Sequence, residues 1–148
     1  MIVLIRITGQ VRVDADITET LNRLRLGKKF TCSIVNETPV MLGMIRKVKD
    51  YIAYGKLDEK TLAEIIKARG KVIGDTKGKI KDPEKIAKEV MAGKKLEDFK
   101  VKPFFGLHPA RGGIDSKHHF HKREDGTFSK GVIGDHGEHI TKLIMKML

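Results

Sequence analysis

The sequence predicts an α+β fold, in which a small three-stranded sheet with two helices is followed by a helical and extended C-terminal elaboration. Three features predict this organisation. A β-branched run opens the chain, strand-like and helix-like patterns alternate over residues 1–57, and residues 58–148 become first helical and then irregular. We therefore divide the chain into a core domain, residues 1–57, and a C-terminal extension, residues 58–148.

The first strand and the first helix are expected before residue 27. Apart from Arg6, residues 2–7 are apolar and mostly β-branched, which is typical of a buried strand. A helix should follow, because Asp16 and Glu19 have the spacing of a capping box and Gly27 offers a left-handed stop. The apolar stripe of this helix comprises Ile17, Leu21 and Leu24.

The alternation of strands and helices continues through the core domain. Residues 30–35 alternate apolar and polar side chains, which predicts a strand with Cys32 in the core. Thr38 and Pro39 are typical of the N-cap and first residue of a helix, and residues 51–55 form a third strand. The stripe of the second helix comprises Met41, Met44, Ile45 and Val48. The order β-α-β-α-β is half of a ferredoxin-like fold, with both helices expected on one face of the sheet.

Two helices are expected at the start of the C-terminal extension. One begins after Asp58 and closes at Gly70, and the other is capped by Asp82 and Pro83 and closes at Gly93. Their inward-facing positions are expected to be Leu62, Ile65, Ile66, Ile86, Val90 and Met91. We interpret these helices as a structural scaffold.

Residues 103–137 are expected to form one long extended loop. They are rich in glycine, histidine and basic residues and have few periodic apolar positions. A terminal helix should follow, with Ile140, Leu143, Ile144 and Met147 on its apolar face. A loop of this length in a small domain is usually functional, or it folds only against a partner.

The composition points to a polyanionic partner. The 148 residues include 30 Lys and Arg against 19 Asp and Glu, a net charge of +11, and such an excess attracts phosphate backbones. The single cysteine cannot form an internal disulfide, which favours a reducing, cytoplasmic setting. No membrane span is expected, since no stretch approaches the ~20 apolar residues that a span needs. Membrane-surface binding is disfavoured because the basic residues are spread along the chain.

The excess charge lies at the two ends of the chain. Residues 1–57 carry 10 basic and 5 acidic residues and residues 100–148 carry 9 and 5, whereas residues 58–99 are nearly balanced at 11 and 9. In the core domain the candidate phosphate contacts lie at a strand end, on loops and on exposed helix faces. They are Arg6, Arg12, Arg23, Arg25, Lys28, Lys29 and Arg46, with Lys47 and Lys49 beside the last of these.

The C-terminal candidates lie within the expected loop. An arginine followed by two glycines lets the backbone approach a phosphate closely while the guanidinium forks onto it. A basic β-hairpin is expected after it, turning at Asp125 and Gly126, with Phe120 and Phe128 available for packing or stacking. The candidates are Arg111, Gly112, Gly113, Lys117, His118, His119, His121, Lys122, Arg123 and Lys130. Such a basic hairpin suits the irregular folds of RNA better than a regular DNA groove.

The histidines raise the alternative of a metal-dependent enzyme. All six lie within the last 41 residues, and His119 with His121, and His136 with His139, have spacings that could ligate a metal. Neither pair comes with a cysteine, because Cys32 is expected in a buried strand. No nucleophile elbow, zinc-protease helix or carboxylate pair is found in the sequence, so an enzyme and a cofactor are both disfavoured. Imidazoles that contact phosphates and bases are the favoured interpretation.

Several of these motifs together resemble the large-subunit ribosomal protein family that is numbered thirty in bacteria and seven in eukaryotes. The short bacterial form is similar to residues 1–57. The matching residues are the opening strand, then Leu21, Leu24, Leu26 and Gly27, and then Thr38, Pro39, Gly43, Met44 and Ile45. The long form is similar to residues 51–55, to Pro109 with Arg111, Gly112 and Gly113, and to Gly134, Asp135 and Gly137 before the last helix. The extension without a long basic N-terminal arm resembles the archaeal type.

The resemblance implies a structural constituent of the large ribosomal subunit that binds and stabilises large-subunit rRNA. It implies no catalysis, no small-molecule substrate and a cytoplasmic, ribosomal location. Expected partners are large-subunit rRNA and neighbouring ribosomal proteins, with the small 5S-type rRNA as a further candidate. Two alternatives stay open at this point: a metal-dependent RNA-processing enzyme that uses the histidines, and a generic protein that binds nucleic acid, DNA included.

Overall fold

The computed structural model describes residues 1–148 apart from residues 75–79, 81, 115, 122–128 and 130, and only the backbone of Ser116 and Lys117. The described part is an α+β structure in which one mixed sheet of six strands has the order β4-β2-β1-β3-β6-β5. The strands are β1 (Ile2–Arg6), β2 (Thr31–Val35), β3 (Ile52–Lys56), β4 (Phe104–Gly106), β5 (Ser116–His119) and β6 (Gly131–Gly137). The helices are α1 (Ala15–Arg23), α2 (Pro39–Val48), α3 (Glu59–Arg69), α4 (Pro83–Met91) and α5 (Ile140–Met147), with a 3₁₀ turn η1 (Leu96–Phe99).

The first strand lies inside the sheet, as its continuous apolar sequence predicts. β1 pairs antiparallel with β2 on one side and with β3 on the other, and all five of its residues are buried. Ile2 and Leu4 face one core, while Val3 and Ile5 face the other. A strand that is covered on both faces needs apolar side chains at every position rather than at alternate ones.

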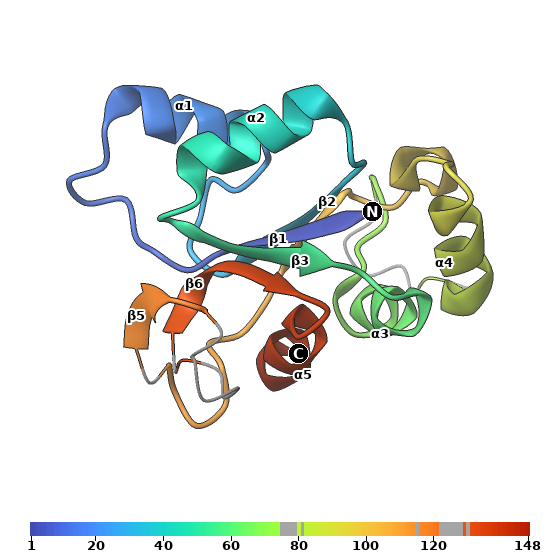
Figure 1. Cartoon of the computed structure of the whole chain (residues 1–148). Helices are drawn as coiled ribbons and strands as arrows, with labels where there is room; N and C mark the ends of the chain where they lie inside the picture. Colours follow the sequence, from blue (N-terminus) through green and yellow to red (C-terminus); the bar gives the residue numbers. More distant parts are fainter. Residues whose placement is uncertain (75–79, 81, 115, 122–128, 130) are drawn as a thin grey trace.

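Helices cover both faces of the sheet (Figure 1). On the upper face in this view, α1 and α2 pack over β1 and β3 through a core that includes Leu21, Ile45 and Val48. On the other face, α5 lies below the sheet, and α3 and α4 pack at its right-hand end. The C-terminal extension therefore covers the face that the two expected helices leave open.

The second helix begins as its sequence predicts. Thr38 is the N-cap, its hydroxyl oxygen accepts a hydrogen bond from the Met41 backbone N–H at 3.3 Å, and Pro39 is the first helical residue. This cap places α2 against the upper face of the sheet.

The first helix begins and ends differently from the prediction. Its N-cap is Asp14, so the expected capping box of Asp16 and Glu19 is wrong. At the other end Arg25, not Gly27, adopts the left-handed conformation, with φ 61°. The Arg25 N–H donates to the Asn22 carbonyl at 2.9 Å and the Leu26 N–H donates to the Leu21 carbonyl at 2.8 Å. This is a Schellman motif, and buried contact between Leu21 and Leu26 stabilises it in place of glycine.

In the described part of the chain the sheet has six strands where the sequence predicts three, because residues 103–137 are not one extended loop. β4 pairs antiparallel with β2, β6 pairs parallel with β3, and β5 pairs parallel with β6. Glycine at Gly131, Gly134 and Gly137 removes the alternation of side chains by which a strand is recognised. The sheet therefore continues from the core domain into the C-terminal extension.

The C-terminal helices follow the predicted pattern with one exception. Ile86 and Val90 are buried, but Met91 at the end of α4 is 39% exposed, so its expected inward position is wrong. The terminal helix buries all four expected residues, Ile140, Leu143, Ile144 and Met147.

The single cysteine provides a test of the core. Cys32 is fully buried on β2, and burial raises its thiol pKa from 9.0 to about 12. This shift lowers the thiolate fraction at pH 8 by about a thousandfold, so an alkylating reagent should label native protein far more slowly than unfolded protein. Equal labelling rates in buffer and in denaturant would contradict this packing.

Candidate nucleic-acid interface

Arg6 is a structural residue and not a surface contact, contrary to its place among the sequence candidates. It is fully buried at the end of β1, and its guanidinium donates hydrogen bonds to four backbone carbonyls. Nε reaches Thr8 O at 3.1 Å, Nη2 reaches Gly9 O at 2.9 Å, and Nη1 reaches Leu26 O at 2.8 Å and Gly27 O at 3.1 Å. Burial lowers the pKa of Arg6 from its usual range, yet the group stays charged at neutral pH.

These bonds join the loop after β1 to the loop before β2. The backbone of Tyr51 joins the turn before β3 to the same loop after β1. The Tyr51 carbonyl accepts from the backbone N–H of Ile7 at 3.1 Å, from that of Thr8 at 3.3 Å and from the Thr8 hydroxyl at 3.2 Å. We call residues 7–14, 26–30 and 49–51 the clasped loop end, after the Arg6 guanidinium and the Tyr51 carbonyl that hold them together. All three segments meet at one end of the strands.

The clasped loop end carries exposed cations. Arg12, Lys28, Lys29 and Lys49 are all exposed. Arg12 lies in a left-handed turn with φ 59°, and the Lys29 ammonium lies 4.6 Å from the centre of the Phe30 ring. Because Arg6 and Tyr51 fix the loops beneath them, these side chains present positive charge from an ordered backbone.

Three other candidates of the core domain lie elsewhere. Arg23 on α1 forms an ion pair with Glu19 at 2.5 Å, and Arg25 pairs with Glu97 of η1 at 2.7 Å. Arg46 is exposed on α2 near Tyr54. The pKa of Tyr54 is raised, mainly by burial and also by the Asp135 carboxylate, and the positive charge of Arg46 offsets part of this rise. Arg23 and Arg25 line a groove beside β2, and Arg46 lies near Tyr54, which is opposite Asp135 in the β3–β6 pair.

The predicted Arg-Gly-Gly element is a turn held against the end of α5. The Arg111 N–H donates to the Lys146 carbonyl at 2.8 Å, and the Gly113 N–H donates to Ala110 at 2.9 Å. Gly112 and Gly113 both have φ 83°, and a Cβ atom at either would meet nothing within 4 Å. Glycine is therefore required here for backbone conformation and not for space.

Two lysines that the sequence interpretation missed lie beside this turn. Lys142 and Lys146 are exposed on α5 and, with Gly113, line a cavity of about 250 Å³. Arg111, whose backbone N–H is bonded to Lys146, is also exposed. The only sequence signal for the two lysines is their position on the polar side of the last helix, which becomes informative once the turn is placed.

The histidines have different environments. His136 is buried, its Nε2 lies 2.9 Å from the Val132 carbonyl, and its ring stacks on Phe120 at 4.0 Å. Burial lowers its pKa from 6.5, so it is neutral at pH 7. His119 Nε2 lies 3.1 Å from the Asp50 carboxylate, which joins β5 to the clasped loop end. Among the described residues, no group of three or more His, Cys, Asp or Glu is placed to hold a metal ion.

Only part of the predicted hairpin lies within the described residues. The Ser129 N–H donates to the His121 carbonyl at 2.8 Å, as pairing across a hairpin requires. His118 and His121 are exposed. Phe120 stacks inside on His136, so it packs rather than offering a base a free surface. Outside the described residues lie Lys122, Arg123, Asp125, Gly126, Phe128, Lys130 and the side chain of Lys117.

The described geometry thus offers two positively charged surfaces for a polyanion. The clasped loop end presents side-chain charge on a fixed backbone, and the turn at Arg111 combines charge with accessible glycine backbone. In the described part of the chain, no helix has the length and apolar character needed to cross a membrane.

Comparisons with known proteins agree with the sequence resemblance. Residues 2–52 match the family model described as ribosomal protein L30p/L7e. The chain is 38% identical to the large ribosomal subunit protein uL30 of Archaeoglobus fulgidus, with 99% of each chain covered. It is 37% identical to uL30 of Methanobrevibacter smithii over 100% of both chains, and 38% identical to uL30 of Nanoarchaeum equitans over 97% of this chain and 96% of the relative.

Proposed function

The chain belongs to the ribosomal protein L30p/L7e family, and on that premise we propose that, as a structural constituent of the large ribosomal subunit, it binds large-subunit rRNA through the clasped loop end and the turn at Arg111. The main support for this proposal is the set of hydrogen bonds by which the buried Arg6 guanidinium joins two loops. A buried arginine that holds two loops together provides a fixed backbone beneath Arg12, Lys28 and Lys29. Contacts of this kind position a protein on a folded RNA by shape and phosphate charge.

The turn at Arg111 supports a second contact. Arg111, Lys142 and Lys146 gather positive charge at the end of α5, and two glycines leave the backbone open to close approach. We propose that this turn and the clasped loop end neutralise rRNA phosphates without catalysis. The 5S-type rRNA is a candidate partner that a binding assay with that RNA would test.

The two alternative functions make different predictions. A metal-dependent nuclease would contain zinc after purification and would cleave RNA in a reaction that a chelator abolishes. A generic nucleic-acid-binding protein would bind duplex DNA as tightly as rRNA at the same salt concentration. The names of the relatives favour neither alternative.

The turn is tested by comparing two alanine variants. Arg111→Ala should weaken binding to large-subunit rRNA fragments by about three- to tenfold and should reduce the salt dependence by about one phosphate contact. Lys85→Ala is the control, because Lys85 is exposed on α4, away from both surfaces, near Asp82 at 3.6 Å. Fluorescence anisotropy across a salt series measures both effects. Equal losses for the two variants would exclude the turn as an RNA contact.

A further inference from the structure

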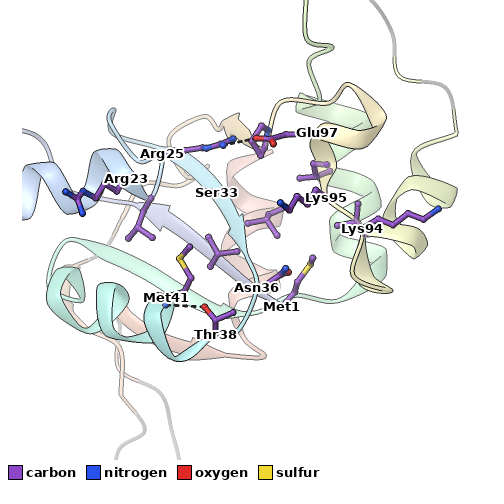
Figure 2. Close-up of a pocket in the computed structure, with 16 residues that line it drawn as sticks. Met1, Arg23, Arg25, Ser33, Asn36, Thr38, Met41, Lys94, Lys95 and Glu97 are labelled. Atoms are coloured by element: carbon purple, nitrogen blue, oxygen red, sulfur yellow. Dashed lines mark hydrogen bonds and ion pairs between the residues drawn. The ribbon is translucent and has the colours of Figure 1, made fainter.

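A groove runs beside β2, on the side of the sheet where α4 and η1 approach α1 and α2 (Figure 2). Its cavity has a volume of about 400 Å³. Arg23 and Arg25 border it from the α1 side, and Lys94, Lys95 and Glu97 border it from the opposite side. Its apolar lining comprises Met1, Leu24, Ile34, Val35, Met41, Val90, Leu96 and Pro103.

The edge of β2 is open along this groove. β4 pairs with β2 only from Thr31 to Ser33, with Phe104 opposite Ser33. Pro103 comes next, and proline has no N–H to continue the pairing. In the part of the chain that the structure describes, Ile34 and Val35 therefore extend β2 beyond the end of β4 and have no strand partner on that edge. Both residues are half-buried in the groove. An open strand edge next to apolar side chains is a template for another strand.

The border of the groove is mainly positive. Among the described lining residues, four are cations, namely Arg23, Arg25, Lys94 and Lys95, and Glu97 is the one anion. Two of these cations pair with carboxylates outside the lining, Arg23 with Glu19 and Lys94 with Glu89, at 2.5 Å each. Glu97 is already engaged by Arg25 at 2.7 Å, and this ion pair closes one end of the groove. The ammonium of Lys95 forms no ion pair with the described residues. The border thus has a surplus of positive charge, centred on Lys95, that is complementary to a carboxylate of a bound segment.

From these features we infer that the groove binds an extended, acidic segment of a neighbouring ribosomal protein. The segment adds a strand to β2 at Ile34 and Val35, places apolar side chains against Leu24 and Leu96, and directs its carboxylates to the positive border, with Lys95 as the first partner. This inference rests on the proposed function, because it takes the partner from the ribosomal subunit.

RNA fits the groove less well. Among the lining residues that the structure describes, there is no aromatic side chain on which a base could stack. Aliphatic side chains and an open peptide edge match another polypeptide, whereas a continuous phosphate backbone would approach Glu97. Arg23 and Arg25 are thereby assigned to a protein contact, separate from the cations of the clasped loop end.

Photo-cross-linking in the assembled subunit tests the inference. A benzophenone amino acid replaces Lys94 in the full-length protein, which is incorporated into large subunits before irradiation. We expect a cross-link to a protein segment that mass spectrometry identifies as acidic and extended. A cross-link to rRNA, or no product above a non-irradiated sample, would overturn the inference. Failure of incorporation would instead count against the proposed function, so the two failures are distinguishable.

A charge reversal sharpens the test. Lys95→Glu in the same cross-linking background should lower the yield of the protein cross-link about threefold or more, because it opposes the carboxylates of the segment. Lys85→Glu makes the same charge change on α4 outside the groove lining and should leave the yield unchanged. Equal yields in the two variants would show that the charge of the groove does not select the segment.

Discussion

Replacing Arg6 by methionine is expected to lower the free energy of unfolding by about 3 kcal/mol. The apolar stem of methionine fills similar space, but the carbonyls of Thr8, Gly9, Leu26 and Gly27 lose the guanidinium that satisfies them. Lysine should not rescue the variant, because an ammonium cannot reproduce the planar fork that reaches two loops. Urea unfolding of the free protein, followed by circular dichroism, measures the change.

Arg12→Met is the matched control for this substitution. Arg12 is exposed on the same loop end, so its loss should change the free energy of unfolding by less than about 0.5 kcal/mol. The two variants should therefore distinguish the buried Arg6, which stabilises the fold, from the exposed Arg12, which is proposed as an RNA contact. An Arg6→Met protein with wild-type stability would contradict the clasp.

Gly55→Ala is expected to have the next largest effect, about 2 kcal/mol of destabilisation. A Cβ at Gly55 on β3 would overlap the Gly137 carbonyl oxygen and lie 2.9 Å from the Ile140 Cβ. Both neighbours belong to the C-terminal extension, at the point where the register of β3 and β6 shifts. The substitution therefore acts on the junction that joins the C-terminal extension to the core sheet.

Gly43→Ala on α2 provides the opposite control. A Cβ there would meet nothing within 4 Å, and alanine is the better helix former, so this variant should be stabilised by about 0.5–1 kcal/mol. Thermal unfolding compares the two variants directly. If Gly55→Ala melted at or above the temperature of Gly43→Ala, the close approach of β3 and β6 would be excluded.

The sequence predicts those elements whose own residues determine them. β1 follows from its continuous apolar run, α2 follows from the cap at Thr38 and Pro39, and α5 follows from its apolar stripe. The end of α1 is different, because Arg25 adopts a left-handed conformation through contacts made by Leu21 and Leu26. Local residue preference favours glycine at that position, and packing overrides the preference.

The C-terminal extension is less predictable for a physical reason. β6 is rich in glycine and buried on both faces, so neither periodicity nor β-propensity identifies it. Only its pairing with β3 makes it a strand, and that pairing is a long-range contact. The fold class could be predicted, whereas the extent of the sheet could not.

Charge predicts the candidate surface better than it predicts individual contacts. Arg12, Lys28, Lys29 and Arg111 are exposed, as an interface requires. Arg6 has the same charge in the sequence but lies inside, because four carbonyls surround it. Sequence alone cannot distinguish these arginines, since the acceptors of Arg6 come from loops up to 21 residues away.

The most direct test of the clasped loop end as an RNA-binding surface is a salt series with the triple variant Arg12→Ala, Lys28→Ala and Lys29→Ala. Binding to large-subunit rRNA fragments and to duplex DNA of equal length is compared with the wild type. The control is Lys60→Ala, Lys67→Ala and Lys88→Ala, which removes three exposed charges from α3 and α4. The proposed interface predicts that wild-type protein prefers rRNA and that only the first variant loses about two units of salt slope. Equal losses in both variants, or equal binding of wild-type protein to DNA and rRNA, would contradict it.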